Sequence, residues 1–574
     1  MKAEDGLRAH EGTDGSPAAP SADRAASLAR LGIERRRDGR HTEAAELYRQ
    51  SLALDPGQLD ASVGLAALLC LQGNAAAAEQ RLSELAGKHR GSVPVLAALG
   101  DARCELGRFR DALECYERAL DEQPGHLGCR LGLARCLAHR PALALRPRSR
   151  ERLAALLQDA EVDPALLAAA AAVLVRASRA PLEHPLLPTL LRSTIVTDLV
   201  LERELTQARR ELCLAPLRQA PALAPALAAQ CRLNEAAWAV TAEEEARLAS
   251  APEWVRAMYD PGGPQADLVE RARRIPALTE VSAGTSAAVR DQYEANPYPS
   301  WERLSHLDPV DLDQRLRLLT GGRWEPPRFL RRPRVLVAGC GTGRELLSVA
   351  LAWRPAAVTG FDLSRTSLAY TELMAERLGV EVDLYQADLL RLDSWEREFD
   401  VVVCAGVLHH LDDPLDGWRR LLRLLRPGGV MLLGLYSETA RRGIAAAQEA
   451  VRRLGLPPTP EGIRRARSHL AGLPPDDPAR DCTLLPDFFH TSGCRDMLFH
   501  VREHRFTLPQ IAAALDGSGL EFLAFVTDAR VRRLARTLFG PQPDLACWAQ
   551  LERLYPGTFL GMYQFWSRKR EGTS

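Results

Sequence analysis

The stretch Arg334–Arg344 reads R-V-L-V-A-G-C-G-T-G-R, and it decides the fold of the second half of the chain. Its apolar run, Val335–Ala338, is typical of a buried parallel strand. Glycines then stand at positions 339, 341 and 343, ahead of a predicted helix over 345–351. Because glycine adopts positive φ and lets a ligand lie against the backbone, the stretch predicts a strand, a tight turn and a helix around a nucleotide-like ligand.

Further predicted strands follow this turn in regular order. We expect them over 357–362, 380–386, 399–405 and 430–436, with a helix over 418–425. Asp362 ends the second strand, nineteen residues after Gly343. A carboxylate at that position can accept hydrogen bonds from the two hydroxyls of a ribose. Asp388 follows the third strand, where it can accept from an adenine amino group.

This series resembles the class I S-adenosylmethionine-dependent methyltransferases. The matching pieces are V-L-V-A-G-C-G-T-G, G-F-D-L-S, Q-A-D-L, F-D-V-V-V-C-A-G-V-L-H-H-L and L-R-P-G-G-V-M-L-L. The resemblance implies an α/β, seven-stranded Rossmann-like domain over 281–570 with S-adenosylmethionine as cofactor. It implies cofactor contacts from Gly339, Cys340, Gly341, Gly343, Asp362, Leu363, Asp388, Leu389 and Ala405. Many relatives carry an acidic residue that orders the amino-acid end of the cofactor where this chain has Val337.

An internal repeat with a period of 34 residues precedes this domain. The recurring positions are Gly39, Gly73 and Gly107; Ala44, Ala78 and Ala112; and Tyr48, Leu82 and Tyr116. The pattern resembles the tetratricopeptide repeat, in which small residues let paired helices approach and an aromatic side chain fills the next gap. We expect an all-α solenoid over 23–140 that binds a protein or peptide partner on its concave face. A rigid spacer or a dimer contact is the alternative.

Composition narrows the remaining choices. The chain has 74 Lys and Arg against 74 Asp and Glu, and a net charge of zero gives no reason to expect nucleic acid. Its 12 cysteines form no C-x-x-C pair and indicate reduced thiols in a cytoplasm. No apolar run reaches membrane-spanning length. We expect disorder over 1–22, and helices over 141–280 that continue the solenoid or link it to the next domain.

Two stretches outside the family motifs combine aromatic and polar side chains. One precedes the first strand, and its candidate substrate contacts are Tyr293, Asn296, Tyr298 and Trp301. The alternative for this stretch is a hydrophobic strap over the sheet. The other lies in an insertion over 438–510, longer than the single helix that the fold needs there. We expect it to form a lid in which Arg495 and Arg505 grip an anionic acceptor; a polar strut is the alternative.

A general base is needed where the acceptor arrives protonated. The candidates are His409, His410, His490, His500 and His504. His409 and His410 follow the fourth strand, where the pocket of the family opens, so one of them is in place to face the acceptor. The alternative is a turn common to the family, in which one histidine has a capping role. A zinc set of His490, Cys494, His500 and His504 has no supporting ligand motif, so we expect no metal.

The sequence therefore predicts methyl transfer to a protein, a carrier-bound or a small hydrophobic acceptor, with the repeats recruiting a partner or substrate. The competing hypothesis is a repeat-based scaffold whose methyltransferase-like domain binds the cofactor without catalysis.

Overall fold

The computed structural model describes residues 19–37, 40–215, 218–262, 266–299, 301–307, 309–322 and 324–570. Most of the predicted disordered segment and Ser300 of the aromatic stretch lie outside these ranges. The first helix begins at Ala19, inside the segment predicted to be disordered. Within the described ranges, no helix has both the length and the apolar character that crossing a bilayer requires.

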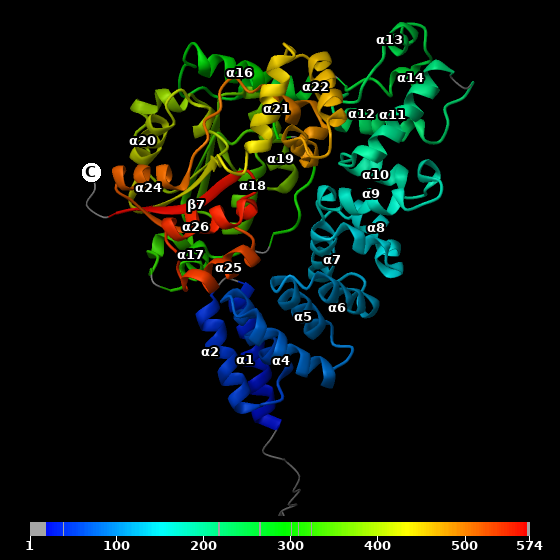
Figure 1. Cartoon of the computed structure of the whole chain (residues 1–574). Coiled ribbons are helices and arrows are strands. Elements are labelled where there is room, and N and C mark those ends of the chain that lie inside the picture. Colours follow the sequence, from blue (N-terminus) through cyan, green and yellow to red (C-terminus); the bar gives the residue numbers. More distant parts are fainter. Residues whose placement is uncertain are drawn as a thin grey trace, which may run out of the picture.

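The repeats fold into helix pairs that stack as a solenoid (Figure 1). The pairs are α1 (Ala19–Arg37) with α2 (His41–Leu54), α3 (Leu59–Leu71) with α4 (Ala75–Lys88), and α5 (Val93–Glu105) with α6 (Phe109–Glu122), followed by α7 (Leu127–His139). Tyr48 shows why small and large residues alternate, because a Cβ on Gly32 or Gly64 would lie 2.6 or 2.3 Å from its ring. The predicted all-α repeat is confirmed.

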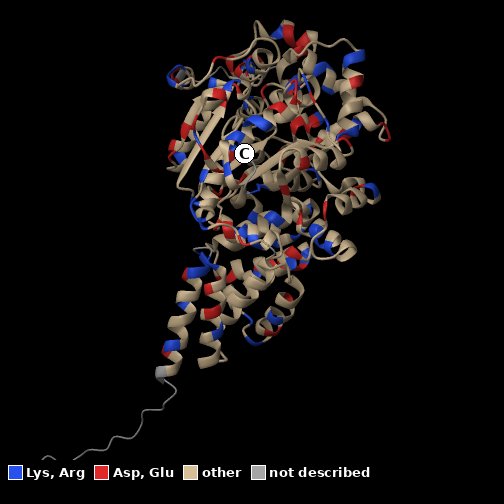
Figure 2. Ribbon diagram, turned by 90° about the vertical axis from the view of Figure 1, so that its left-hand side faces the viewer, with Lys and Arg blue, Asp and Glu red and all other residues tan. Residues whose placement is uncertain are grey.

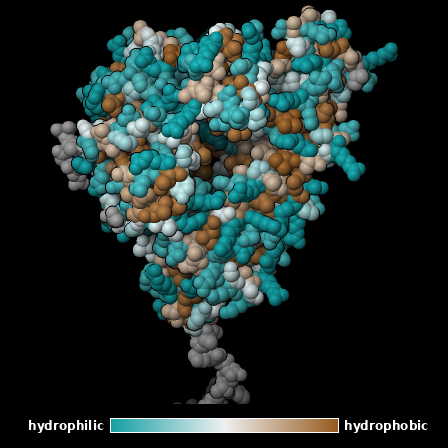
Figure 3. Space-filling view, viewed as in Figure 1, coloured by the Kyte–Doolittle hydropathy of each residue, from teal (hydrophilic) through white to brown (hydrophobic). Residues whose placement is uncertain are grey.

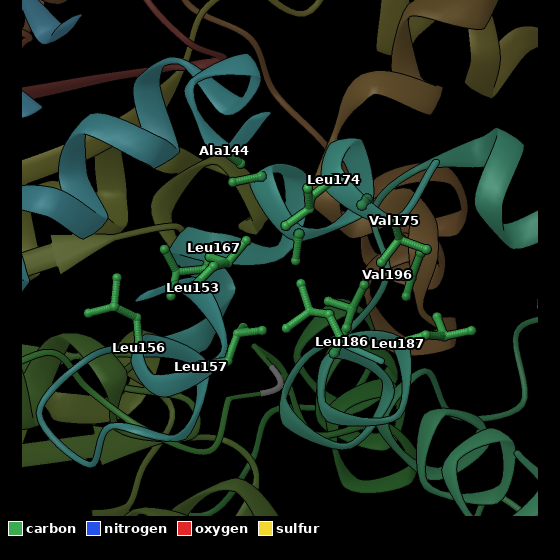
Figure 4. Packing of buried hydrophobic residues seen from close by; sticks show 14 of the residues in the cluster. Ala144, Leu153, Leu156, Leu157, Leu167, Leu174, Val175, Leu186, Leu187 and Val196 are labelled. Atoms are coloured by element: carbon green, nitrogen blue, oxygen red, sulfur yellow. The ribbon is translucent and has the colours of Figure 1, made fainter. Parts of the chain in front are cut away.

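The middle segment continues the solenoid. Its helices are α8 (Pro147–Gln158), α9 (Ala168–Arg176), α10 (Leu187–Ser193), α11 (Leu199–Leu214), α12 (Ala224–Leu233), α13 (Ala242–Leu248) and α14 (Glu253–Arg256). The next helix, α15 (Ala266–Arg274), packs instead against the C-terminal part, where Arg271 donates to Glu372 and Glu376. Leucine and valine side chains from α8 to α10 pack against one another (Figure 4). The same hydrophobic core runs from Leu96 in the repeats to Met258, so repeats and middle segment share one core.

The C-terminal part contains a seven-stranded sheet in the order β3-β2-β1-β4-β5-β7-β6. The strands are β1 (Arg334–Ala338), β2 (Ala357–Asp362), β3 (Asp383–Gln386), β4 (Phe399–Ala405), β5 (Leu425–Tyr436), β6 (Leu520–Phe525) and β7 (Met562–Lys569). The strands β1 to β5 pair in parallel, and β7 is antiparallel between β5 and β6. The predicted Rossmann-like sheet is confirmed. β5 begins at Leu425 and not at the predicted Val430, and its pairing with β4 has a register shift at the added end.

Helices flank this sheet and also build the insertion. Those of the basic fold are α16 (Thr285–Ala295), α17 (Leu312–Leu319), α18 (Arg344–Trp353), α19 (Arg365–Leu378), α20 (Pro414–Leu424), α24 (Leu508–Gly517), α25 (Ala529–Phe539) and α26 (Leu545–Leu554). The insertion contributes α21 (Arg442–Arg453), α22 (Pro460–Gly472) and α23 (Thr491–Phe499) around a hydrophobic core of its own. It lies beside α11 and α12 of the solenoid (Figure 1).

The solenoid curves along one side of the sheet domain and touches it at both ends (Figure 1). Near the N-terminus, Arg533 of α25 donates to the carbonyl of Glu105 at 2.6 Å, at the end of α5. Midway, Arg303 donates to the carbonyls of Asp159 and Leu157, each at 2.9 Å. The space-filling view shows a hollow in the face turned toward the viewer (Figure 3), and both signs of charge are interspersed on the side that Figure 2 shows. The chain's own α25 therefore covers part of the repeat surface.

Candidate active site

A cavity of about 370 Å³ opens at the carboxyl ends of β1, β2 and β4. Eight of the predicted cofactor contacts line it: Gly339, Cys340, Gly341, Asp362, Leu363, Asp388, Leu389 and Ala405. Gly343 is not in the lining and instead precedes α18 in the left-handed conformation, with φ of 85°. Residues from both halves of the parallel sheet therefore meet in one cavity.

The glycine turn is held by the carboxylate at the end of β2. Gly339 and Gly341 have φ of 65° and 53°, which glycine adopts without a steric penalty. One oxygen of Asp362 accepts from the amide of Gly341 at 2.8 Å, and the other accepts from Ser364 at 2.9 Å. Burial raises the pKa of Asp362, and these two amides oppose that rise. Asp362 thus combines a position in the cavity with a direct hold on the turn.

Asp388 is fixed in a similar way beside apolar side chains. Its two carboxylate oxygens accept from the amides of Leu390 and Ser282, each at 2.9 Å. A carboxylate offers about four lone-pair sites, so each oxygen can accept a further hydrogen bond from a ligand. Phe361 and Leu389 line the same cavity and provide the apolar surface that a planar base needs. These acceptors and apolar surfaces fit an adenosine group.

The sequence motifs did not identify two charged residues at the start of α18. Val337 is buried in the sheet core, as its position in β1 requires. Glu345, in the first turn of α18, lines the cavity, and burial raises the pKa of its carboxyl. Arg344 also lines the cavity and donates to Asp163 of the solenoid at 2.5 Å. An acidic group therefore lies beside the glycine turn, although it comes from the helix and not from β1.

Some residues of the aromatic stretch before β1 line the cavity, and others hold the stretch against neighbouring backbone. Tyr293 and Tyr298 line the cavity. A Cβ on Gly341 would lie 2.8 Å from the carbonyl oxygen of Tyr298, so the stretch lies directly against the glycine turn. Trp301 is buried outside the lining, where its indole donates to the carbonyl of Thr342 at 3.1 Å. Asn296 is also outside the lining, and its amide donates to the carbonyl of Gln292.

The insertion reaches the same cavity through α23. Asp496 lines the cavity and accepts from the hydroxyl of Tyr293 at 2.5 Å. Asp487 accepts from the hydroxyl of Tyr298 at 3.0 Å. Neither Arg495 nor Arg505 is among the lining residues. The expected arginine grip on an anionic acceptor therefore has no support in the structure, which places a carboxylate there instead.

The five histidine candidates occupy different environments. His410 lines the cavity, and its Nδ1 lies 2.8 Å from the carbonyl of Arg502. Because a carbonyl only accepts, Nδ1 carries the proton and Nε2 is left as the acceptor. Burial lowers the pKa of His410 well below its usual value. His409 is buried behind it and stacks on Tyr436 with ring centroids 3.6 Å apart.

The remaining histidines lie outside the cavity lining. His500 stacks on His410 at 3.5 Å, and burial lowers its pKa to about 4. His490 caps α23 by accepting from the amide of Gly493 at 3.1 Å. His504 donates its backbone amide to the carbonyl of His409 at 2.8 Å. The structure therefore brings one of the five candidates into the cavity and places the others around it.

The alternative zinc set does not come together. Cys494 directs its thiol to the carbonyl of Phe488 at 3.0 Å. Among the described residues, His410, Asp496 and His500 bring ligand-type atoms within 4.8 Å of one another. The rings of His410 and His500 are nearly parallel, at 22°, with centroids 3.5 Å apart. Their in-plane lone pairs run side by side and do not converge on one ion at ordinary bond lengths of about 2.1 Å.

Comparison with known proteins agrees with this geometry. Residues 335–429 match the model of a methyltransferase domain, and residues 36–101 and 93–126 match models of the tetratricopeptide repeat. An uncharacterized protein of Synechococcus sp. is 32% identical over 268 residues, which cover 45% of this chain and 64% of that protein. The ubiquinone biosynthesis O-methyltransferase of Pseudomonas putida is 35% identical over 157 residues, covering 27% and 65%. The chain thus spans slightly less than two thirds of the length of these relatives.

A solved structure, PKMT2 from Rickettsia typhi, is similar over 43% of this chain and 51% of its own, with 17% identity and a TM-score of 0.35. The family models and the strand order define the class of the C-terminal part as an S-adenosylmethionine-dependent methyltransferase domain. This chain joins such a domain to N-terminal tetratricopeptide repeats.

Proposed function

We propose that this chain transfers the methyl group of S-adenosylmethionine to an amine, carried by a protein, a carrier-bound group or a small hydrophobic molecule. The observation that carries the proposal is a single cavity lined by two chemically different groups of residues, which we call its donor end and its acceptor end. One end has the glycine turn, Asp362 and Asp388. The other has His410 and Asp496 among tyrosines. The repeats would recruit the acceptor or a partner that presents it.

The donor end fits the cofactor of this domain class. Asp362 would hold the ribose hydroxyls, Asp388 the adenine amino group, and the glycine turn the methionine part. Bound S-adenosylmethionine supplies a methyl group on a positively charged sulfur, which is electrophilic without further activation. The protein therefore needs chiefly to orient the acceptor and exclude water, and such positioning can contribute roughly 7–11 kcal/mol.

The acceptor end favours a cationic group because the carboxyl of Asp496 has no positively charged partner there in the part of the chain that the structure describes. Arg441, which lies over the ring of Tyr436, is paired with Glu503 through bonds of 3.1 and 2.8 Å. Among the described residues, Asp496 accepts a hydrogen bond only from the hydroxyl of Tyr293 and forms no ion pair. An ammonium group would supply the missing positive charge, and its deprotonation would give the attacking amine.

The proton would leave through His410 or Asp496. Burial raises the pKa of both Tyr293 and Tyr298 well above its usual value, so these hydroxyls stay protonated and act as donors. Neutral His410 keeps Nε2 as an acceptor. The competing outcome is an oxygen acceptor, for which a hydroxyl would need the same base.

Methyl transfer is expected to increase with pH through neutrality. Burial raises the pKa of Asp496 from 3.8 to about 7, so the carboxyl is protonated below that pH and anionic above it. If the anion pairs with the incoming ammonium, activity rises as pH increases through about 7. His410 contributes no inflection there because its pKa is lowered. The measurement is label transfer from methyl-labelled S-adenosylmethionine into cell lysate between about pH 5.5 and 8.5.

The Asp496→Asn variant is the matched comparison. We expect it to lose the rise near pH 7 and most of its turnover while keeping donor affinity, since Asp496 is at the acceptor end. Chemical analysis of the labelled product then distinguishes N-methyl from O-methyl groups. An unchanged pH profile in the variant, or label found only on oxygen, would reject the amine assignment.

A further inference from the structure

The middle helical segment has no role in the predicted chemistry, yet one of its loops contacts the insertion with unusual geometry. The loop follows α12, and in it Glu235 and Ala236 have φ of 57° and 56°. Residues other than glycine rarely adopt this left-handed conformation, which persists where surrounding contacts enforce it. The contacts at this loop are made with the first turn of α23.

Four hydrogen bonds join the loop to α23. The amide of Thr491 donates to the carbonyl of Asn234 at 3.2 Å, and its hydroxyl donates to the carbonyl of Glu235 at 2.7 Å. The carboxylate of Glu235 accepts from the amide of Ser492 at 2.6 Å and from its hydroxyl at 2.8 Å. The first amides of a helix have no partner within the helix, and an anion there is favourable. Glu235 thus caps α23 from the solenoid.

The capped helix carries the acceptor end of the cavity. Asp496 lies four residues after Ser492, which places both on the same face of α23. His500 directly follows this helix and stacks on His410 of the cavity. Any shift of α23 along its axis would therefore move the carboxyl of Asp496 and the ring packed on His410 together.

We propose that Glu235 is a positioning residue for the methyl-transfer site, which couples the conformation of the solenoid to the acceptor end of the cavity through α23. The expected effect on methyl transfer rests on the proposed function, whereas the expected effect on the position of α23 does not. A partner bound to the solenoid would act on the reaction through this contact, without touching the cofactor end.

The test compares Glu235→Ala and Glu235→Gln in the full chain with Glu243→Ala, a control at an exposed position on α13. The first readout is hydrogen–deuterium exchange of residues 491–499. We expect exchange in Glu235→Ala to rise by about tenfold or more, because the amide of Ser492 loses its acceptor and the first turn keeps only the side-chain cap from His490. Glu235→Gln keeps one side-chain oxygen acceptor and should be intermediate, while Glu243→Ala should match the parent.

The second readout compares the effect of each substitution on donor affinity with its effect on turnover. Donor affinity by calorimetry with S-adenosylmethionine should stay within about twofold, whereas label transfer to lysate should fall roughly tenfold to a hundredfold, as for a misplaced catalytic group. Unchanged exchange over 491–499 in Glu235→Ala would overturn the proposal, as would parallel losses of donor affinity and turnover. If the parent itself transfers no label, the proposed function fails, and the exchange result still decides whether Glu235 positions α23.

Discussion

Replacing Arg467 with alanine is expected to lower the free energy of unfolding by about 3–5 kcal/mol. Arg467 of α22 is 3% exposed and pairs with Glu202 of α11 through bonds of 2.9 and 2.8 Å. It also donates to the carbonyls of Phe488 and Ala237, which belong to the insertion and the solenoid. The substitution leaves a largely buried carboxylate and the carbonyl of Ala237 without their donor. The carbonyl of Phe488 keeps only the weak thiol donor of Cys494, so the expected loss is large.

Urea unfolding followed by tryptophan fluorescence would measure this effect, since Trp238 is buried next to the contact. Arg453→Ala is the control, because Arg453 is 77% exposed and pairs with Glu449 at the surface. Its loss should change stability by no more than about 0.5 kcal/mol. Equal unfolding curves for the two variants would mean that the insertion is not held to the solenoid by this pair.

Asp362→Ala is expected to weaken binding of S-adenosylmethionine by about 1.5–3 kcal/mol, or roughly tenfold to a hundredfold in Kd. The substitution removes a charged acceptor for the ribose hydroxyls. It also releases the amides of Gly341 and Ser364, which Asp362 now holds. Both losses act on the donor end, so the affinity should fall without an equal loss of folding.

Calorimetric titration measures this change directly. Asp383→Ala is the matched control, because Asp383 is an exposed carboxylate at the opposite end of the neighbouring strand β3. It should bind the donor as the parent does. If Asp362→Ala retained the affinity of the parent, the ribose would be held by another group, and the assignment of the donor end would be wrong.

The sheet could be predicted from the sequence because its signals are local. Apolar runs of strand length, each followed by glycine or a carboxylate, placed the strands, and the structure confirms their order. The repeats were predictable for a related reason, since each period contains its own small and aromatic residues. Strand ends were less predictable: β3 begins at Asp383, whereas its apolar pattern begins at Val380.

The acceptor end was predicted only in part because distant segments build it. The aromatic and lid stretches were recognisable by composition, but the pairing of Tyr293 with Asp496 joins residues 203 positions apart. The sequence pointed to Arg495 and Arg505 as the binding groups of the lid. Asp496, which lies between them in the sequence, lines the cavity instead. Glu345 was missed because the expected acid belongs at position 337, and no local pattern shows that a side chain from α18 lines the cavity.

The cap on α23 is further still from any sequence pattern. Glu235 lies in a short loop of the helical segment, and its partner Ser492 is 257 residues away. No periodicity links them, and the left-handed backbone at Glu235 and Ala236 has no glycine to indicate it. Such contacts depend on how the insertion packs against the solenoid, which is settled only in the folded chain.

The central claim is that this cavity catalyses methyl transfer, against the alternative of a scaffold that binds the cofactor without reaction. The most direct measurement incubates the purified full chain with methyl-labelled S-adenosylmethionine and cell lysate, beside Asp362→Ala and Asp496→Asn. We predict that the parent labels an acceptor, that Asp362→Ala fails through weak donor binding, and that Asp496→Asn fails although it binds the donor. Saturable donor binding by the parent, with no more label on any acceptor than the variants give, would contradict it.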